Sequence, residues 1–438
     1  MNSKPRISLE ALSEDNSKLW KPVYWRPDRH DDNQKLMLDR LRHLGIMGLP
    51  SEDVARSEEH VNKSFGVFRG SEEAPFAGPY AFIAPTRIER YSKLDYTNEA
   101  RGPYPAITHL QQDAAQVFLS AQSPCILDYY GEDPNSPNGV MVFAPLFMDM
   151  LKDYETDPLL ADPNFVTKVM NATVAFARDR GGVKYAGLAA VLPALTNFGQ
   201  SITEKGVELS TGHAGTVWAM EEAALRVIEE GLGEVVKGDI KQGLTIVGLG
   251  GIGLSTAVSL RNRHPNIPLH VYDNREKAIG RARTQLNGSV VYHDSLQDAM
   301  NATRLTLSAV TGQLDLTGVN REGLVVVDDS QPGSVDQDSL RGSGGFVVGV
   351  YTDGGSMTTR NLFDYADRCA VGSSETFSCH ANVAAVAAEA EAGGSVTELC
   401  FRRPVEPTDV ARVAELFGRH GVKAAPLQWG WGGYHSAS

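Results

Sequence analysis

The chain has 438 residues, more than one hydrophobic core usually supports, so two or three domains are expected. Its 41 Lys and Arg residues against 54 Asp and Glu residues give a net charge of −13, which argues against a nucleic-acid-binding protein, because such proteins present basic surfaces. The 42% hydrophobic and 22% charged content is typical of a folded chain, not of a disordered one.

Residues 1–139 form a polar region with many Pro and Gly interruptions. A helix is predicted over 35–44 (KLMLDRLRHL), because its leucines recur at spacings near three and four. The run 131–139 (GEDPNSPNG) is dense in turn formers, so we expect a loop there and a candidate boundary between an N-terminal extension and the rest.

The pattern changes from residue 140 onward. The apolar run 140–147 (VMVFAPLF) predicts a buried strand, although so short a run is also compatible with a helix. The spacing of apolar residues predicts a helix over 164–178, and the Ala- and Leu-rich run 186–195 predicts a core element.

A further helix is predicted just after Ser210. Either Ser210 or Thr211 can cap it, and its apolar residues fall on one face. We expect Glu221 and Glu222 of this helix to point toward solvent.

From residue 244 onward, short apolar runs alternate with helical segments. The expected strands are 244–247, 269–272, 289–292, 305–310, 324–327 and 346–351. Such alternation is typical of βαβ units and a parallel sheet. Helices are expected at 376–392 and at about 408–419, and a strand-like run at 397–401 (TELCF) lies between them.

Membrane and secretory features are absent from the sequence pattern. No apolar run reaches the roughly 18 residues that a membrane-spanning helix needs. The first residues (MNSKPRISLEALSEDN) have no apolar core or cleavage site of a secretory signal. No Cys-x-x-Cys pair occurs among the four cysteines, so we expect reduced thiols, no metal and a cytoplasmic location.

The strongest local motif is G-x-G-x-x-G at 248–253, directly after a predicted strand and at the start of a predicted helix. The first glycine permits a tight turn, the second lets the backbone approach a pyrophosphate, and the third lets helix and strand pack closely. The N–H groups at the helix start would then face the phosphates. A lone motif of this kind is weak, but strand, loop, helix and second strand follow in order here, which favours dinucleotide binding over a simple turn.

The second strand ends in Asp273, at the position where an acidic side chain accepts hydrogen bonds from the ribose hydroxyls. Such an acid also repels a 2′-phosphate, so we favour NAD over NADP. Arg275 could hold a phosphate instead, or could be a solvated residue at a helix start. The expected cofactor-binding residues are Gly248, Gly250, Gly251, Ile252, Gly253, Asp273, Asn274, Arg275, Ser308 and Thr311.

The order of several blocks over roughly 140–427 resembles the long-chain acyl-(acyl-carrier-protein) reductases. These blocks are VFAPLFMDM, ALTNFG, LSTGHAGTVWAM, VGLGGIG, VVVDDSQPG, SETFSCHANVAAVAAEAE and RHGVKAAPL. The middle of the chain is also similar to shikimate dehydrogenase. Both resemblances imply a nicotinamide-binding Rossmann domain, with the substrate held between it and a preceding α/β domain.

Two departures separate the chain from the acyl reductases. Their thioester-forming cysteine lies just before a strand ending in Val-Asp, and the matching residue here is Leu324, which cannot act as a nucleophile. Their second strand is also of the NADP type and lacks an acid like Asp273.

We therefore expect an α/β fold with a Rossmann-type parallel-sheet NAD-binding domain at 236–375. A substrate-binding α/β domain is expected at 140–235, and 1–139 is an N-terminal extension that could belong to it. The C-terminal helix and segment, 376–438, are expected to pack back on the substrate domain.

Several residues are candidates for chemistry at a substrate pocket. His213 could serve as a general acid with a pKa near neutrality, or could only cap its helix. Cys379 and His380 would lie on a helix that lines the pocket in the shikimate-type arrangement, although a free cysteine more often packs as a small apolar residue. Lys184 could polarise a carbonyl, but most lysines are solvated.

Ser210, Thr211 and Asp328 are further expected pocket residues; Asp328 and Asp329 end a strand at the carboxyl edge where ligands of such sheets bind. The predicted function is an NAD(H)-dependent oxidoreductase that moves a hydride to or from an aldehyde, ketone or imine carbon without a cysteine acyl-enzyme. The alternatives are an acyl-thioester reductase, by direct hydride or through Cys379, and a non-catalytic nucleotide-binding partner protein. The substrate would be a small or carrier-bound molecule, and a homo-oligomer is compatible with the sequence.

Overall fold

The computed structural model describes residues 6–86, 104–147, 163–235, 237–238, 240–330, 333–359 and 374–429. The chain forms two compact units. The first unit is Met1–Leu209 with Arg360–Phe363, and the second unit is Ser210–Thr359 with Asp364–Ser438.

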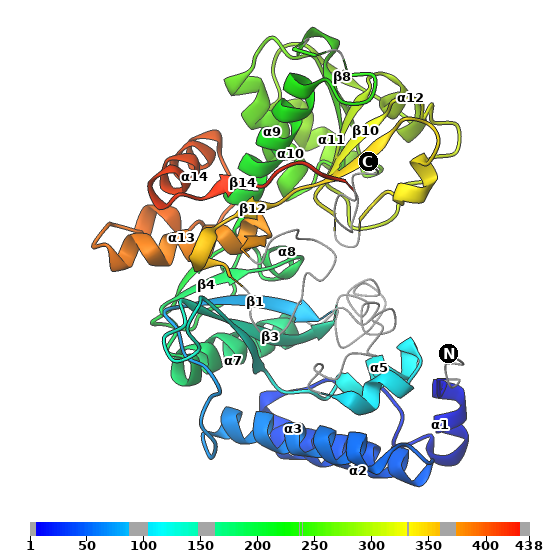
Figure 1. Ribbon diagram of the computed structural model, residues 1–438, viewed down its shortest axis with the longest axis vertical. Coiled ribbons are helices and arrows are strands. Elements are labelled where there is room, and N and C mark those ends of the chain that lie inside the picture. Colours follow the sequence, from blue (N-terminus) through cyan, green and yellow to red (C-terminus); the bar gives the residue numbers. More distant parts are fainter. Residues whose placement is uncertain are drawn as a thin grey trace. The chain divides into compact units, whose positions relative to one another are not determined.

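Helices form the N-terminal part of the first unit (Figure 1). They are α1 (Leu9–Asn16), α2 (His30–Ile46), α3 (Ser51–Arg69) and α5 (Gln112–Leu119), with short 3-10 helices at Pro27–Arg29 and Pro105–His109. The helix predicted at 35–44 is confirmed as the C-terminal two thirds of α2, and its apolar face, including Met37, Leu41 and Leu44, is fully buried.

The first unit also contains a five-stranded sheet of order β2-β3-β1-β4-β5, whose first strand lies between α3 and α5 in the chain. Its strands are β1 (Tyr80–Thr86), β2 (Cys125–Tyr130), β3 (Gly139–Phe147), β4 (Tyr185–Leu188) and β5 (Glu208–Ser210). β1 pairs in parallel with β3 and β4, and β2 pairs antiparallel with β3. The strand predicted at 140–147 is therefore confirmed. The turn-rich run before it is a loop, as expected, but it joins two paired strands of one sheet, because turn formers mark hairpins as readily as linkers.

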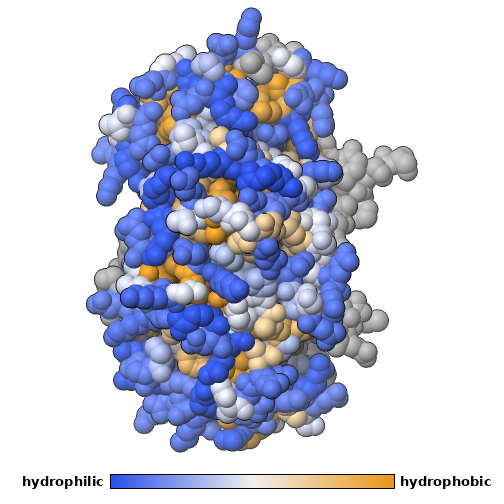
Figure 2. Space-filling view, turned by 90° about the vertical axis from the view of Figure 1, so that its left-hand side faces the viewer, coloured by the Kyte–Doolittle hydropathy of each residue, from blue (hydrophilic) through white to orange (hydrophobic). Residues whose placement is uncertain are grey.

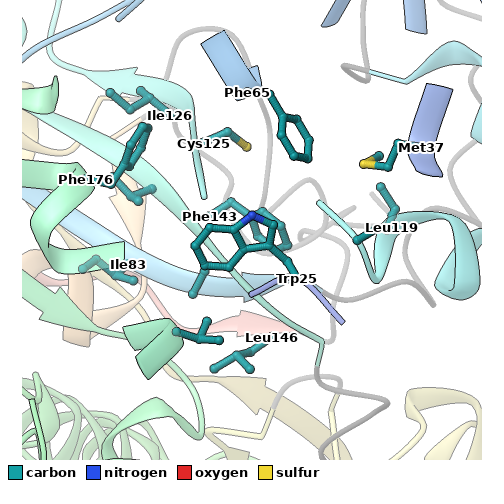
Figure 3. Packing of buried hydrophobic residues seen from close by; sticks show 14 of the residues in the cluster. Trp25, Met37, Phe65, Ile83, Leu119, Cys125, Ile126, Phe143, Leu146 and Phe176 are labelled. Carbon is teal, nitrogen blue, oxygen red and sulfur yellow. The ribbon is translucent and has the colours of Figure 1, made fainter. Parts of the chain in front are cut away.

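The remaining helices of the first unit are α7 (Pro163–Gly181) and α8 (Leu192–Leu195). α7 confirms the helix predicted at 164–178 and packs on β3. Figure 3 shows the core between the sheet and the helices, where the Trp25 indole lies beside Phe143 and side chains from α2, α3, β2 and α7 surround them.

The second unit is built on a seven-stranded sheet of order β15-β11-β10-β9-β6-β7-β8. Its strands are β6 (Leu244–Val247), β7 (Leu269–Tyr272), β8 (Val290–Tyr292), β9 (Leu305–Ser308), β10 (Val325–Asp328), β11 (Phe346–Gly349) and β15 (Gln428–Trp429). All of the pairings from β8 to β11 are parallel, and β15 joins the edge antiparallel. Numbered from β6, the parallel strands run 3-2-1-4-5-6, the Rossmann order, which confirms the predicted fold class.

The helices of this unit are α9 (His213–Glu230), α10 (Gly251–Arg263), α11 (Glu276–Gln285), α12 (Leu296–Asn301), α13 (Ser378–Glu391) and α14 (Pro407–His420). α13 and α14 lie beside α9 (Figure 1). A small antiparallel sheet of β12 (Thr352–Asp353), β13 (Glu375–Thr376) and β14 (Lys423–Ala424) is formed next to them. The helices expected at 376–392 and 408–419 are confirmed to within two residues at each end.

Two local predictions in this unit are wrong. The run at 397–401, expected to be strand-like, contains a 3-10 helix, Thr397–Leu399, and pairs with no strand among the described residues. The apolar side chains of Leu399 and Phe401 are buried, but burial alone does not distinguish a strand from other short elements. Glu221 does not face solvent and is fully buried, because α9 is covered by α10, α13 and α14 and so has more than one buried face. Its carboxylate pairs with Arg263 of α10.

Hydrophobic residues on the face drawn in Figure 2 occur in small areas separated by hydrophilic side chains. Among the described residues, the large hydrophobic side chains that are exposed are Ile46 and Val291. Within the same residues, the helices are all too short or too polar to cross a bilayer.

Candidate functional site

The glycine loop between β6 and α10 has the geometry that each of its three motif glycines was expected to provide. Gly248 has a φ of +90°, a conformation that favours glycine, and it makes the tight turn after β6. A Cβ on Gly253 would lie 1.8 Å from the carbonyl oxygen of Gly248, so only glycine permits this approach of helix to strand. A Cβ on Gly250 would meet only Arg275 Nη2, at 3.8 Å, so the backbone of the second glycine is open to a bound group. Gly251 and Ile252 then begin α10, with their side-chain positions exposed or half-buried.

Asp273, one residue after β7, lies beside this loop. Its Oδ2 accepts a hydrogen bond from the Leu249 backbone N–H at 2.7 Å, which ties the second strand to the glycine turn. Arg275 donates from Nε to Oδ1 and from Nη2 to Oδ2, each at 2.9 Å, and its backbone N–H also donates to Oδ1. Burial alone would raise the pKa of Asp273, but these hydrogen bonds outweigh it and lower the pKa. The carboxylate is therefore ionised and held in place, while Asn274 next to it is exposed.

Ser308 at the end of β9 is fully buried and its hydroxyl is occupied. Ser308 Oγ lies 2.6 Å from Ser334 Oγ, and the Ser308 carbonyl accepts from the Asp329 backbone N–H. The hydroxyl thus joins β9 to the segment after β10. Thr311, also expected beside the cofactor, is exposed three residues beyond the strand.

Asp328 ends β10 with its carboxylate buried. It accepts hydrogen bonds from the backbone N–H groups of Ser330, at 2.9 Å, and Ser334, at 2.6 Å. Burial raises the pKa of Asp328, and these hydrogen bonds oppose the shift. This carboxylate therefore holds the backbone that follows β10, a structural role in place of the expected pocket role.

Among the described residues, no backbone N–H group donates to the carboxyl of Asp329, the next residue along the chain. Burial, with the nearby Asp328 carboxyl, raises its pKa well above the ordinary value. The Asp329 carboxyl also acts electrostatically on Cys379. Leu324, just before the strand, is fully buried in the apolar core and offers no reactive group.

Cys379, in the first turn of α13, packs against the turn before α9. A Cβ on Gly212 would lie 2.5 Å from Cys379 Cβ, so the two segments touch through a glycine in the left-handed conformation, with φ +68°. Burial, and then Asp329, raises the pKa of the Cys379 thiol to about 12, although the backbone N–H groups of the helix start oppose the shift. The ends of β10, α9 and α13 therefore meet in the second unit.

His213 is the first residue of α9, and the two hydroxyl residues before it hold the turn. Ser210 Oγ accepts from the Gly212 N–H at 3.2 Å, and Thr211 Oγ1 accepts from the His213 N–H at 3.4 Å. The expectation that Ser210 or Thr211 caps the helix is wrong: the N-cap residue is Gly212, and the two hydroxyls hold the preceding turn by accepting from backbone N–H groups two residues farther on. Burial lowers the pKa of His213 to about 4, so the expectation of a pKa near neutrality is wrong; the imidazole is neutral at pH 7.

The other two candidates have structural contacts. His380 is buried, and its Nδ1 lies 2.8 Å from Thr376 Oγ1, which fixes the ring to the strand before α13. Lys184 belongs to the first unit, where its side chain is exposed and its backbone bonds Pro79 and Glu208. These contacts fit a solvated Lys184 side chain better than a catalytic one.

One polar group near Cys379 was missed by the sequence reasoning. Asn382 is fully buried one turn farther along α13, and within the described parts of the chain neither its Nδ2 nor its Oδ1 has a hydrogen-bond partner. Ser378 Oγ, one turn earlier on the helix, is in the same state. Buried amides are nearly always hydrogen-bonded, so such a residue marks a position where a ligand or water can complete the bonding. An asparagine within the Ala-rich run ANVAAVAAEAEA was the available signal.

The arrangement can bind a dinucleotide and place polar groups at the carboxyl edge of the sheet. In the described residues, no three His, Cys, Asp or Glu side chains gather as metal ligands would. The order of the strands reverses between β6 and β9, and ligands of open α/β sheets bind at this switch point.

No known family profile matches the chain, and no curated protein does. The comparisons therefore do not support membership in the acyl-(acyl-carrier-protein) reductases or the shikimate dehydrogenases that the ordered blocks resemble.

Solved structures match over parts of the chain. One is 3-hydroxyisobutyrate dehydrogenase from Mycobacterium tuberculosis with L-serine, at 14% identity over 24% of this chain and 39% of that chain, with a TM-score of 0.22. Another is the D-arabinose dehydrogenase from Sulfolobus solfataricus, at 14% identity, 44% and 53% coverage and a TM-score of 0.26. TarJ from S. aureus in complex with NADPH matches at 17% identity, 31% and 42% coverage and a TM-score of 0.23.

The chain spans between about two fifths and about half of the length of these three proteins. TM-scores this low do not identify a relative. The strand order and the side chains of the second unit are therefore what indicate its function.

Proposed function

We propose that the chain is an NAD(H)-dependent oxidoreductase that transfers a hydride to or from an aldehyde, ketone or imine carbon of a small metabolite. The observation that carries this proposal is the glycine loop at the switch point of a 3-2-1-4-5-6 parallel sheet, with an ionised acid after the second strand. A turn made only for packing would not need the open backbone at Gly250.

The chain's residues fit a dinucleotide. The N–H groups at the start of α10 would bind the pyrophosphate, and Asp273 would accept hydrogen bonds from the adenosine ribose. A bound nicotinamide would supply or accept the hydride. Because an ionised carboxylate disfavours a 2′-phosphate, the proposal includes a preference for NAD over NADP.

The polar groups where β10, α9 and α13 meet would orient the reacting carbon and its oxygen or nitrogen. His213, neutral at pH 7, can donate a hydrogen bond without carrying charge. Asp329, whose pKa burial and the Asp328 carboxyl raise well above its ordinary value, is the better candidate for a proton donor. Asn382 can supply the two amide contacts that a buried ligand would complete. The first unit is proposed to contribute to substrate binding.

The alternative function is an acyl-thioester reductase that works through Cys379. The raised pKa of this thiol disfavours that route. Direct hydride delivery to a thioester remains compatible with the same residues.

The test is a fluorescence titration of the full-length protein with NADH and NADPH, followed by a panel of aldehydes, ketones, imines and an acyl thioester. We expect NADH to bind more tightly and at least one carbonyl or imine to be reduced. Tighter binding of NADPH would refute the NAD preference. Binding without turnover on any substrate would favour the non-catalytic partner protein, and release of free thiol from the thioester would favour the thioester reductase.

A further inference from the structure

The contact between Arg275 and Asp273 has a consequence for how a dinucleotide could bind. Both carboxylate oxygens of Asp273 are occupied: Oδ1 by the Arg275 backbone N–H and Nε, and Oδ2 by Nη2 and the Leu249 N–H. The carboxylate is 2% exposed, while the Arg275 side chain is 61% exposed. The two backbone donors are fixed by the fold, and the guanidinium is the partner that can leave.

The guanidinium also lies next to the open glycine. Its Nη2 is 3.8 Å from the position that a Cβ of Gly250 would take, on the side of the loop left free for a bound group. It therefore covers the acid that a ribose would use and borders the space beside the loop. Within the described residues, the hydrogen bonds and the ion pair of the Arg275 side chain all go to Asp273, so a rotation of this side chain breaks no other bond.

We propose that Arg275 is a displaceable counter-ion that sets the choice between the two nicotinamide dinucleotides. In the arrangement seen here it competes with the ribose hydroxyls for the Asp273 carboxylate, and so weakens NADH binding. Turned away from Asp273, the same guanidinium can pair with a 2′-phosphate, and so keeps NADPH binding measurable. The inference rests on the proposed dinucleotide-binding function.

The size of each effect follows from the exposure of the pair. An ion pair with one partner largely in solvent contributes little, so its removal should tighten NADH binding about two- to fivefold. A guanidinium paired with a phosphate forms a strong charge-assisted contact, so its loss should weaken NADPH binding by about tenfold or more. The two changes have opposite signs, which a general effect on the fold would not produce.

The experiment compares the dissociation constants of NADH and NADPH, measured by fluorescence titration, for the wild type, Arg275→Ala, Arg275→Gln and Asp273→Ala. Arg281→Ala is the matched control, because it removes an exposed arginine from α11, the helix whose N-cap residue is Arg275, without touching Asp273. Melting temperatures are recorded for each variant; because the Arg275 side chain is exposed, the two Arg275 variants should melt near the wild-type temperature.

We expect both Arg275 variants to bind NADH more tightly and NADPH more weakly than the wild type. Asp273→Ala should do the reverse, because it removes the ribose acceptor and frees Arg275. Arg281→Ala should leave the ratio of the two constants unchanged. Arg275 variants that weaken both dinucleotides alike, or change neither, would overturn the inference while leaving the proposed function intact. A wild-type protein that binds neither dinucleotide would overturn the proposed function and the inference with it.

Discussion

Gly250→Val separates cofactor binding from folding. The backbone at Gly250 has a φ of −71°, which any residue adopts, and a Cβ there would have only Arg275 Nη2 nearby, at an ordinary contact distance of 3.8 Å. The folded state should therefore lose no more than about 1 kcal/mol, the usual effect of exchanging glycine at a helix N-cap for an apolar residue. The valine side chain would instead fill the space through which the backbone approaches a pyrophosphate.

We expect the dissociation constant for NADH to rise at least about 100-fold, or about 2.8 kcal/mol at 1.4 kcal/mol per factor of ten. The assay is NADH fluorescence titration beside a thermal melt. Gly280→Ala is the control, since a Cβ there meets nothing within 4 Å and lies in the middle of α11. It should keep NADH binding and raise stability by roughly 0.5–1 kcal/mol. Normal NADH binding by a folded Gly250→Val protein would show that the loop is only a turn.

Two further predictions concern buried titratable groups. Burial raises the pKa of Glu221 to about 7, against the opposing Arg263, so the native state holds a proton that the unfolded chain has released between about pH 4.5 and 7. As the pH rises through this window, the free energy of unfolding of the wild type should fall relative to that of Glu221→Gln, by up to about 1.4 kcal/mol per pH unit. Melting temperatures of the two proteins that change in parallel from pH 5 to 8 would contradict this. His213→Ala should lower turnover by about 10²–10³-fold, the usual effect of removing one hydrogen-bond donor to developing charge, with NADH binding unchanged. The wild-type pH–rate profile should lack a histidine ionisation near 6.5, and full activity of the variant would remove His213 from the mechanism.

The sequence predicted those parts of the fold whose signals are local. The loop 248–253, the strands on either side of it and the acid at Asp273 lie within about 30 residues, so order along the chain was enough to predict the arrangement that the structure has. β1 was not predicted, although it is the central strand of the first sheet. Its sequence, YAFIAPT, is a short apolar run containing a proline, and its partners β3 and β4 follow about 60 and 105 residues later.

The candidate site shows the same limit. Cys379, Asp329 and Gly212 come from three distant segments, and only the packing of α13 against α9 brings them together. The pKa of His213 depends on that enclosure, so a residue type with an ordinary value near neutrality gave the wrong expectation. Glu221 was misplaced because helical spacing assumes a single buried face, whereas three helices cover α9.

The last prediction concerns whether a cysteine forms an acyl-enzyme. A nucleophilic cysteine reacts as the thiolate, and a helix start is a place where thiolates are often stabilised. Cys379 has this position, but burial and the neighbouring Asp329 carboxyl outweigh the helix and raise its pKa to about 12. At pH 7 only roughly one thiol in 10⁵ would be ionised, which leaves too little thiolate for an efficient covalent step.

Cys379→Ser should therefore retain most of the turnover, because direct hydride delivery breaks a C–H bond and forms another without a thiol. Asp329→Asn tests the electrostatic effect on the thiol. Because the Asp329 carboxyl raises the pKa of Cys379 only where it is itself ionised, its loss should speed alkylation by iodoacetamide at alkaline pH and leave the rate at pH 7 unchanged, read by mass spectrometry of the peptide. The wild-type thiol should alkylate slowly in the folded protein and fast after denaturation. Two results together would refute this reasoning: no turnover by Cys379→Ser, and a thioester adduct on the α13 peptide of the wild type after incubation with an acyl thioester. The protein would then be a thioester reductase with a relocated nucleophile. Such an adduct forms only from the thiolate, which the surroundings of Cys379 suppress.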